Sequence, residues 1–172
     1  LHKEKTNNNF SVGDIYLGKV RKIMPGLNAT FVNVGYEKDA FLHYLDLGAK
    51  FNSFAKFTKG VVGGRINSSS LDVEFEPEIE KTGKIEKTLK SSDQILVQIA
   101  KEPISTKGPR LSSEISIAGR YLVLVPFSNK VSVSQKIKDA EERERLIRLI
   151  KSIKPKGFGM FIYAWYTGAN CV

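Results

Sequence analysis

Apolar and polar residues alternate in short stretches over the first fifty positions of the chain. Between Val12 and Asp46 this pattern predicts three strands, which are separated by the turn-forming segments PGLN (25–28) and GYEKD (35–39). The first strand, roughly 14–23, contains Gly18, and a glycine inside a strand is typical of a bulge or a sharp bend. Short, curved strands of this kind are what a small closed barrel uses.

The alternation predicts that two phenylalanines face outward. Side chains along a strand point to opposite faces in turn, so if Val32 and Val34 face the core, Phe31 faces away from it. In the next strand Leu42 points inward and Phe41 outward in the same way. Because both sides of these strands carry apolar residues, the pattern also allows the reverse assignment, with Phe31 and Phe41 in the core and Val32 outside.

The alternation is lost between residues 49 and 92. Charged loops with Gly and Pro fill this stretch, and only two short helices are indicated, near 51–59 and near 84–89. We interpret residues 49–92 as an insertion between the third and fourth strands. A connection of this length is unusual in a compact domain. The basic residues between Lys56 and Arg65 are better explained by a solvated loop than by an RNA contact.

Alternation returns over residues 95–99, which predicts a fourth strand, and a fifth is expected over 111–117. Five short strands predict an OB-type barrel made of residues 12–48 and 93–117, so the expected fold is mainly β with some α. Residues 1–9 are polar and rich in Asn, and we expect residues 1–11 to form a flexible lead-in.

A second unit is predicted from residue 118 onward. The run AGRYLVLVPF (118–127) is almost continuously apolar, which is typical of a strand buried on both faces and exceeds what a lone barrel needs. A short strand near 130–137 follows. Apolar residues then recur at helical spacing from Leu146 to Ile153, with Asp139 as the expected N-cap. Residues 118–159 are therefore predicted to form the start of an α/β region.

The balance of charges favours a polyanionic partner. The 172 residues contain 27 Lys and Arg against 18 Asp and Glu, a formal net charge of +9. A solvated basic surface would explain this charge alone equally well. Two outward aromatic rings add a platform on which unpaired bases stack, and the loop KEPISTKGPR (101–110) adds cations beside a glycine. The residues predicted to bind single-stranded RNA are therefore Phe31, Phe41, Lys101, Lys107 and Arg110.

Other classes of function find little support in the sequence. No apolar run is long enough to cross a membrane, and residues 1–9 lack the apolar core of a secretion signal. The single cysteine, Cys171, suits a reducing cytoplasm. His43 has no partner Cys or Ser motif, and the acidic residues of the insertion form no oxygen-rich loop motif. We therefore expect neither a catalytic centre nor a metal site in this chain.

Two stretches carry a resemblance to a known family. The segment IYLGKVRKIMPGLNATFVNVG (15–35), followed by DAFLH (39–43), resembles the start of an S1-type RNA-binding domain. The segment ILVQIAKEPISTKGPRLSSEISIAGRYLVLVP (95–126) is similar to a region of the ribonuclease E/ribonuclease G family, and not to S1-type domains at large. The resemblance extends from about Val12 to Phe158, apart from the insertion.

The resemblance implies the RNA-binding N-terminal part of a bacterial endoribonuclease that cleaves single-stranded RNA in rRNA processing and mRNA decay. In this family the residues that match Phe31, Phe41 and Lys107 contact RNA. Cleavage there uses Mg²⁺, held by two aspartates of a nuclease domain further along the chain, and the full-length proteins are homo-oligomers joined through zinc-binding cysteines. We expect the present chain to lack that nuclease domain, to be inactive by itself and to be monomeric.

The resemblance also identifies residues from 118 onward as the start of the 5′-sensor region, which binds the monophosphate at the RNA 5′ end. Gly119 and Val123 match residues that line its pocket. An Arg and a Thr grip the phosphate in the family, and Tyr163 and Ala164 occupy their places here. Because the resemblance ends abruptly near the start of segment 160–172, we interpret that segment as a divergent tail of the kind that a reading-frame error leaves.

Two alternative functions remain open at this stage. A stand-alone S1-type RNA-binding module without nuclease activity would account for the barrel, but it has no use for residues 119–158. An OB-type barrel that binds protein or sugar would not need the net charge of +9.

Overall fold

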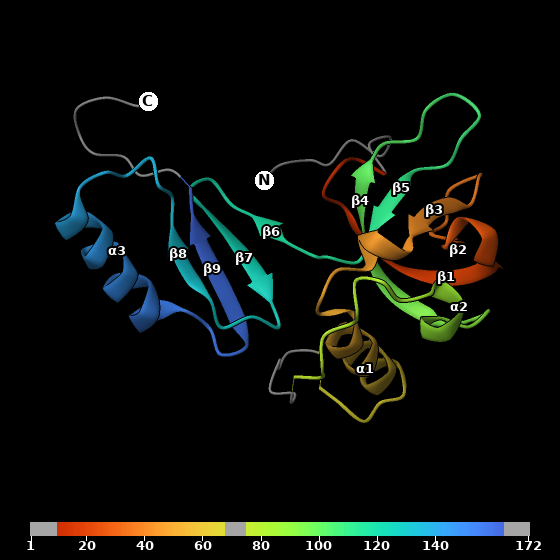
Figure 1. Cartoon of the computed structure of the whole chain (residues 1–172), viewed down its shortest axis with the longest axis horizontal. Helices are drawn as coiled ribbons and strands as arrows, with labels where there is room; N and C mark the ends of the chain where they lie inside the picture. Colours follow the sequence, from red (N-terminus) through yellow and green to blue (C-terminus); the bar gives the residue numbers. More distant parts are fainter. Residues whose placement is uncertain (1–9, 68–74, 164–172) are drawn as a thin grey trace, which may run out of the picture. The chain divides into compact units, whose positions relative to one another are not determined.

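The computed structural model describes residues 10–67 and 75–163, which fall into two compact units. The first unit comprises residues 10–67 and 75–115, and the second comprises residues 116–163 (Figure 1). The expected lead-in as far as Asn9 lies outside the described residues, as does the expected tail beyond Tyr163.

The first unit is built on five strands that close into a barrel in the order β1-β2-β3-β5-β4 (Figure 1). Strands β3 and β5 run parallel, and all other neighbours run antiparallel. This confirms the predicted five-stranded barrel. The strands are β1 (Ile15–Met24), β2 (Ala29–Asn33), β3 (Ala40–His43), β4 (Gln94–Lys101) and β5 (Arg110–Ser112).

Strand β5 is shorter than the expected span of 111–117. It ends at Ser112, and the next residue bonds sideways: the N–H of Ser113 donates to the carbonyl of Asp46 (2.7 Å), and its hydroxyl donates to the carbonyl of Leu96 (2.7 Å). Ile117 already lies in a strand of the second unit. The segment expected to form one strand is therefore divided between two units.

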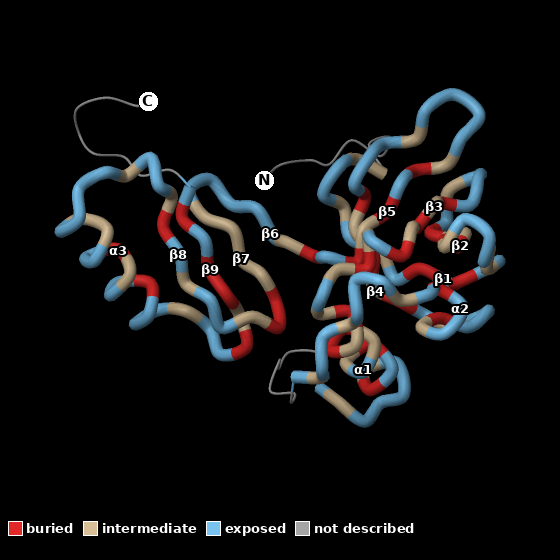
Figure 2. The backbone as a smooth tube through the Cα atoms, viewed as in Figure 1, coloured by how far each residue is buried: buried red, intermediate tan, exposed pale blue. Residues whose placement is uncertain are grey.

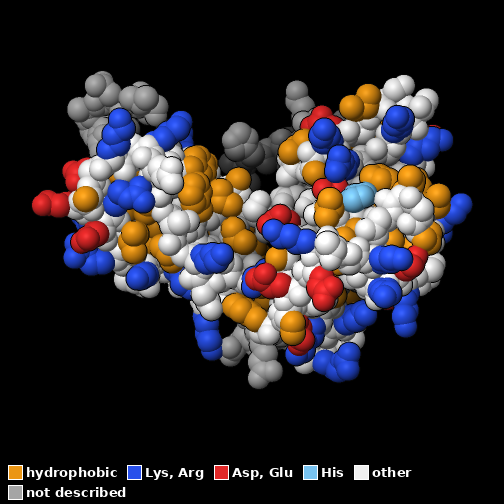
Figure 3. All heavy atoms as spheres, viewed as in Figure 1, with side chains coloured by type: hydrophobic (Ala, Val, Ile, Leu, Met, Phe, Trp, Pro, Cys, Tyr) orange, Lys and Arg blue, Asp and Glu red, His pale blue; other side chains and the backbone are white. Residues whose placement is uncertain are grey.

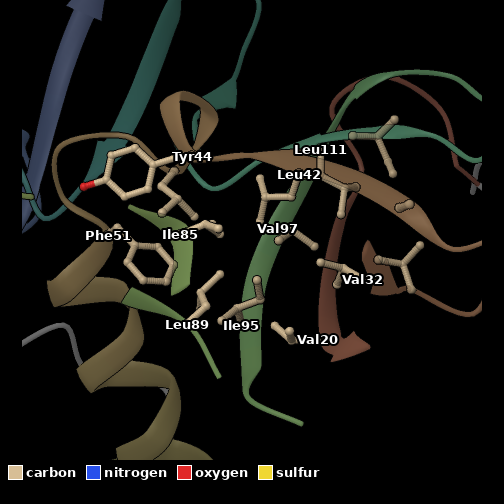
Figure 4. Packing of buried hydrophobic residues seen from close by; sticks show 14 residues of the cluster. Val20, Val32, Leu42, Tyr44, Phe51, Ile85, Leu89, Ile95, Val97 and Leu111 are labelled. Carbon is tan, nitrogen blue, oxygen red and sulfur yellow. The ribbon is translucent and has the colours of Figure 1, made fainter. Parts of the chain in front are cut away.

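The barrel core consists of inward-facing residues from all five strands (Figure 4). Val32 and Leu42 are fully buried, as are Val97 on β4 and Leu111 on β5. The prediction that Val32 faces inward is confirmed, and the reverse assignment is excluded. Burying one such side chain contributes about 1.5–3 kcal/mol, so this interior supplies much of the stability of the barrel.

Gly18 allows a close approach between strands and does not mark the bulge. A Cβ atom at Gly18 would lie 2.5 Å from Cγ1 of Val32, so that valine fills the space where a side chain would be. The irregularity in β1 comes three residues later, at Arg21, where the register shifts between Val20↔Val32 and Lys22↔Phe31. A β-bulge of this kind bends the strand and re-aims the side chains beyond it.

The segment 49–92 contains the two predicted helices, α1 (Phe51–Val62) and α2 (Ile85–Thr88). Both belong to the barrel unit, because Phe51, Ile85 and Leu89 pack in the same core as the strands (Figure 4). The basic stretch of this segment was expected to be a loop, but it is largely helical, since α1 continues to Val62.

Asn28 joins the end of this segment to the β1–β2 turn, a short 3₁₀ helix (Pro25–Leu27). Its side-chain amide donates to the carbonyl of Gly83 (3.0 Å), and its oxygen accepts from the N–H of Ile85 (2.7 Å). Asn28 has φ +47°, a left-handed conformation that asparagine tolerates better than most residues. The segment is thus hydrogen-bonded to the barrel at a specific point.

The second unit is a four-stranded sheet in the order β6-β7-β9-β8, with helix α3 packed on it (Figures 1 and 2). Leu146 and Ile150 of α3 pack against Val133, Met160 and Ile162 of the sheet. The elements are β6 (Ile117–Ala118), β7 (Leu122–Pro126), β8 (Val131–Val133), α3 (Ala140–Ile153) and β9 (Phe158–Ile162). This confirms the predicted α/β region.

The N-terminus of α3 is capped as the sequence predicts. Oδ1 of Asp139 accepts from the N–H groups of Glu141 (2.9 Å) and Glu142 (3.3 Å). The expectation that β7 is buried on both faces is wrong for the described residues, because Leu122 to Val125 are only half-buried. None of the helices formed by the described residues is long and apolar enough to cross a membrane.

Candidate nucleic-acid interface

A single row of side chains crosses all five strands on the outside of the barrel. Pairing joins Lys22 to Phe31 and Phe31 to Phe41. It continues from Phe41 to Arg110 across the parallel pair, and from Arg110 to Lys101. Directly paired residues lie on the same face of a sheet. We call these five residues the outer row: Lys22, Phe31, Phe41, Arg110 and Lys101.

The centre of the outer row is aromatic. The rings of Phe31 and Phe41 have centroids 5.9 Å apart and planes inclined by 69°, an edge-to-face pair. Both residues are half-buried, while the neighbouring Val32 and Leu42 are fully buried on the inside. The buried neighbours fix the strand positions, so the two rings form a preformed apolar surface flanked by cations on both sides.

Arg110 is held in a defined orientation beside Phe41. Its Nε donates to Oδ2 of Asp46 (3.1 Å), and its Nη2 lies 2.9 Å from Oδ2 and 3.3 Å from Oδ1. Two-point contacts of this type are a preferred geometry for arginine and carboxylate. The Arg110 side chain remains 47% exposed, against 25% for Asp46, so the guanidinium stays accessible to a ligand.

Lys107 lies in a loop that packs against the β2–β3 connection. The N–H of Phe41 donates to the carbonyl of Pro109 (2.9 Å), and a Cβ atom at Gly108 would lie 2.3 Å from the carbonyl oxygen of Asp39. Only glycine permits this backbone contact. Lys107 and Lys38 are therefore carried on adjacent backbone segments next to the outer row, and both are exposed.

All five residues predicted to bind RNA thus lie on the outer surface of the barrel or directly beside it. Four of them lie in the outer row, and Lys107 lies in the adjoining loop. Sequence reasoning missed Lys22, because strict alternation from the buried Val20 puts it inside. The bulge at Arg21 reverses that assignment. Sequence reasoning also missed Asp46, an acidic residue at the end of a predicted strand.

One of the two predicted pocket residues of the second unit, Gly119, contacts Tyr163. The hydroxyl of Tyr163 donates to the carbonyl of Gly119. The backbone N–H of Tyr163 donates to the carbonyl of Tyr121 (3.2 Å). Val123 pairs with Phe161 in the next strand. Ala164 lies outside the described residues. Tyr163 brings a hydroxyl and a ring to this place, but no positive charge.

Two of the three arginines of α3, Arg143 and Arg145, are engaged within their own unit. Nη1 of Arg143 donates to the carbonyls of Ser134 (2.7 Å) and Ile137 (3.2 Å). Arg145 donates to Glu142, and this hydrogen bond lowers the pKa of the Glu142 carboxyl below its usual value. These contacts favour a structural role for both arginines over an RNA contact.

No three His, Cys, Asp or Glu side chains among residues 10–67 and 75–163 come together in a way that could hold a metal ion. In the segment 49–92, Glu76 pairs with Lys56, and Glu78 pairs with Lys50 (2.7 Å). These carboxylates of the described part are therefore neutralised by lysines.

Comparison with known proteins bears on the second unit and on the chain as a whole. The sequence profile of the Ribonuclease E/G family matches residues 116–168. Ribonuclease E of Synechocystis sp. is 38% identical over 152 residues, which are 88% of this chain. Ribonuclease G of Haemophilus influenzae is 32% identical over 170 residues, 99% of this chain, and ribonuclease G of Escherichia coli (strain K12) is 34% identical over 150 residues, 87% of it.

This chain belongs to the ribonuclease E/G family. The similarity covers both units, since the aligned residues amount to most of the chain. The chain spans only part of these ribonucleases: 19% of the length of the Synechocystis protein, 31% of the Haemophilus protein and 27% of the Escherichia protein.

Proposed function

We propose that this chain is the RNA-binding N-terminal part of a ribonuclease G/E-like endoribonuclease specific for single strands, and that the outer row holds the RNA. The observation that carries the proposal is the continuity of the row across five strands. Two rings at its centre offer stacking surfaces, and cations at both ends offer contacts to the backbone phosphates. This combination suits single strands, whose bases are free to stack.

The parts of the site have separate roles in this proposal. Phe31 and Phe41 stack unpaired bases with little preference for sequence, because every base has an aromatic face. Lys22, Lys101 and Lys107 are exposed point charges that follow the phosphates and position the strand. The expected complex is therefore sensitive to salt: about four neutralised phosphates, counting that at Arg110, give a slope of about −3 in log affinity against log salt.

The activity of the whole protein forms a wider part of the proposal. The parent enzyme would process rRNA and degrade mRNA in the cytoplasm, as a homo-oligomer that uses Mg²⁺. The residues of the described part do not provide a site for that ion, because no suitable group of carboxylates comes together. The role proposed for this chain is to bind and position RNA. The second unit would correspond to the start of a 5′-sensor region, with Gly119 and Val123 at its pocket.

The experiment that tests the RNA-binding role is a fluorescence-anisotropy titration of the whole chain with a labelled, unstructured RNA. Replacement of Phe31 by Ala is expected to weaken binding by about 1–3 kcal/mol. The matched control is Leu17→Ala, which removes a 48% exposed apolar side chain elsewhere on β1 and should leave the affinity unchanged. Equal affinities for the wild type and the Phe31→Ala variant would refute the proposed placement.

The salt dependence of the affinity distinguishes this function from the alternative of a barrel that binds protein or sugar. Binding through phosphates must weaken steeply between low and physiological salt. The Lys107→Ala variant should lower the salt slope by about 0.7, as expected for the loss of one phosphate contact on a single strand. The control is Lys136→Ala, which removes an exposed lysine from the second unit. Binding that is indifferent to added salt would favour the alternative.

A further inference from the structure

An acidic side chain within an RNA-binding surface requires an explanation. Asp46 lies in the 3₁₀ turn Tyr44–Leu47, directly after β3, and its carboxylate contacts Arg110 of the outer row. A carboxylate at this position repels the phosphates of a bound RNA. Its contribution to stability does not account for its presence, because ion pairs this exposed contribute little. A role in orienting Arg110 would account for it.

The backbone around Asp46 is unusually well fixed. Its carbonyl accepts from the N–H of Ser113 (2.7 Å) and from the hydroxyl of Ser112 (3.1 Å), two residues that follow Arg110 closely along the chain. These two hydrogen bonds hold the backbone of Asp46 next to the chain segment that carries Arg110. The Asp46 carboxylate therefore has little freedom to move. Because Arg110 donates to it at two points, the plane of the Arg110 guanidinium is fixed as well.

The contact with Asp46 leaves part of Arg110 available. The guanidinium has five N–H groups, and the bonds to Asp46 use those on Nε and Nη2, so the two N–H groups on Nη1 can donate elsewhere. Arg110 pairs with Phe41 on the neighbouring strand, and the backbones of paired strands lie about 4.8 Å apart. A fixed guanidinium plane can stack with a base, as an aromatic ring does.

We propose that Asp46 is a positioning residue, which orients Arg110 so that its guanidinium serves as a third flat surface next to Phe31 and Phe41. This inference rests on the proposed RNA-binding function. The outer row then accommodates three consecutive nucleotides, two on rings and one on the guanidinium, with a phosphate oxygen at Nη1. Asp46 does not touch the RNA and acts only through Arg110.

The test is a double-mutant cycle with Asp46→Asn and Arg110→Lys, each titrated with the same labelled RNA. Arg110→Lys keeps the charge but loses the plane, and it should weaken binding about two- to tenfold, in the range of couplings between contacting residues. Asp46→Asn should also weaken binding, although it makes the protein more positive. In the Arg110→Lys background the same substitution should leave the affinity unchanged or raise it, because only the repulsion is then removed.

Two controls separate orientation from damage to the fold. Glu37→Gln removes an 83% exposed carboxylate from the β2–β3 connection and should raise the affinity slightly or leave it unchanged. The Asn variant keeps the backbone carbonyl that Ser112 and Ser113 use, so its thermal unfolding should match that of the wild type. In the nuclear magnetic resonance spectrum, the Arg110 Nε–H signal should shift and exchange faster with water when Asp46 is replaced.

A loss of affinity on Asp46→Asn replacement that disappears or reverses in the Arg110→Lys background supports the inference. An increase in affinity on Asp46→Asn replacement in both backgrounds would overturn it, since the carboxylate would then only repel the RNA. A decrease of equal size in both backgrounds would overturn it as well, since the effect would not pass through Arg110. If the wild type binds no RNA, or binds it independently of Phe31, the proposed function itself fails and this inference fails with it.

Discussion

Phe31 and Phe41 face each other directly across β2 and β3, with ring centroids 5.9 Å apart on the outer side of the barrel. Large apolar residues at such positions lose much of the stabilisation that burial would give them. Val32 and Leu42, the next residues along the same strands, take the buried places instead. If the proposed function holds, the inner face of these strands provides stability and the outer face contacts RNA, and the two properties should respond to different substitutions.

Stability should depend on the inner face of these strands more than on the outer face. Leu42→Ala removes a fully buried side chain and should lower the free energy of unfolding by about 2–5 kcal/mol. Phe31→Ala should cost less, mainly the aromatic pair of about 0.5–1.5 kcal/mol. Urea denaturation of both variants measures the difference. A larger loss for Phe31→Ala than for Leu42→Ala would mean that the rings, and not the aliphatic residues, form the core.

Gly18 should not accept a side chain. Its Cβ would lie 2.5 Å from Val32 and 3.3 Å from Val34 and Val97, so Gly18→Ala should destabilise the barrel by about 1–3 kcal/mol through overpacking. Gly26→Ala is the control, because nothing lies within 4 Å of that position and a change of about 0.5 kcal/mol or less is expected. In thermal unfolding, Val32→Ala should partly rescue Gly18→Ala. Strict additivity of the two losses would contradict the predicted clash.

Asn28 should link the segment 49–92 to the barrel. Asn28→Ala leaves the N–H of Ile85 and the carbonyl of Gly83 without their side-chain partner, at a cost of about 1–3 kcal/mol. Asn28→Asp keeps the acceptor for Ile85 and should cost less. Hydrogen exchange should show faster exchange of the Ile85 amide in the Ala variant, whereas unchanged protection of that amide would contradict this role.

Binding should not distinguish RNA with a 5′ monophosphate from RNA with a 5′ hydroxyl. Tyr163 stands close to Gly119 but brings no positive charge to the predicted pocket. A phosphate gripped there would need a charge-assisted donor. Competition between the two RNAs, matched in length and sequence, measures the preference. A clear advantage for the monophosphate would show that another residue of the second unit supplies the missing charge.

Much of the fold was predictable because local patterns and packing agree. Alternation gave the correct faces for Val32 and Leu42, and Asp139 marked the start of α3 because capping depends on neighbouring residues only. The position of Lys22 was not predictable, since a bulge of one residue at Arg21 inverts the alternation beyond it.

Long-range features of the first unit also escaped prediction from local pattern. Ile85 and Leu89 enter the barrel core from a segment without periodicity, which only tertiary contacts reveal. The end of β5 is set by hydrogen bonds from Ser113 to Asp46 and Leu96, residues far away in the sequence. The bond to Asp46 places that residue beside Arg110, so the proposed orienting contact could not be foreseen either.

The most direct test of RNA binding at the outer row is residue-by-residue mapping of the contact. Amide signals of the isotope-labelled chain are followed by nuclear magnetic resonance while a short oligouridine is added. The account predicts that the largest shifts cluster on Phe31, Phe41, Arg110 and Lys101, and extend to Lys22 across the bulge. Shifts confined to α1 or to the second unit, with the outer row unaffected, would contradict it.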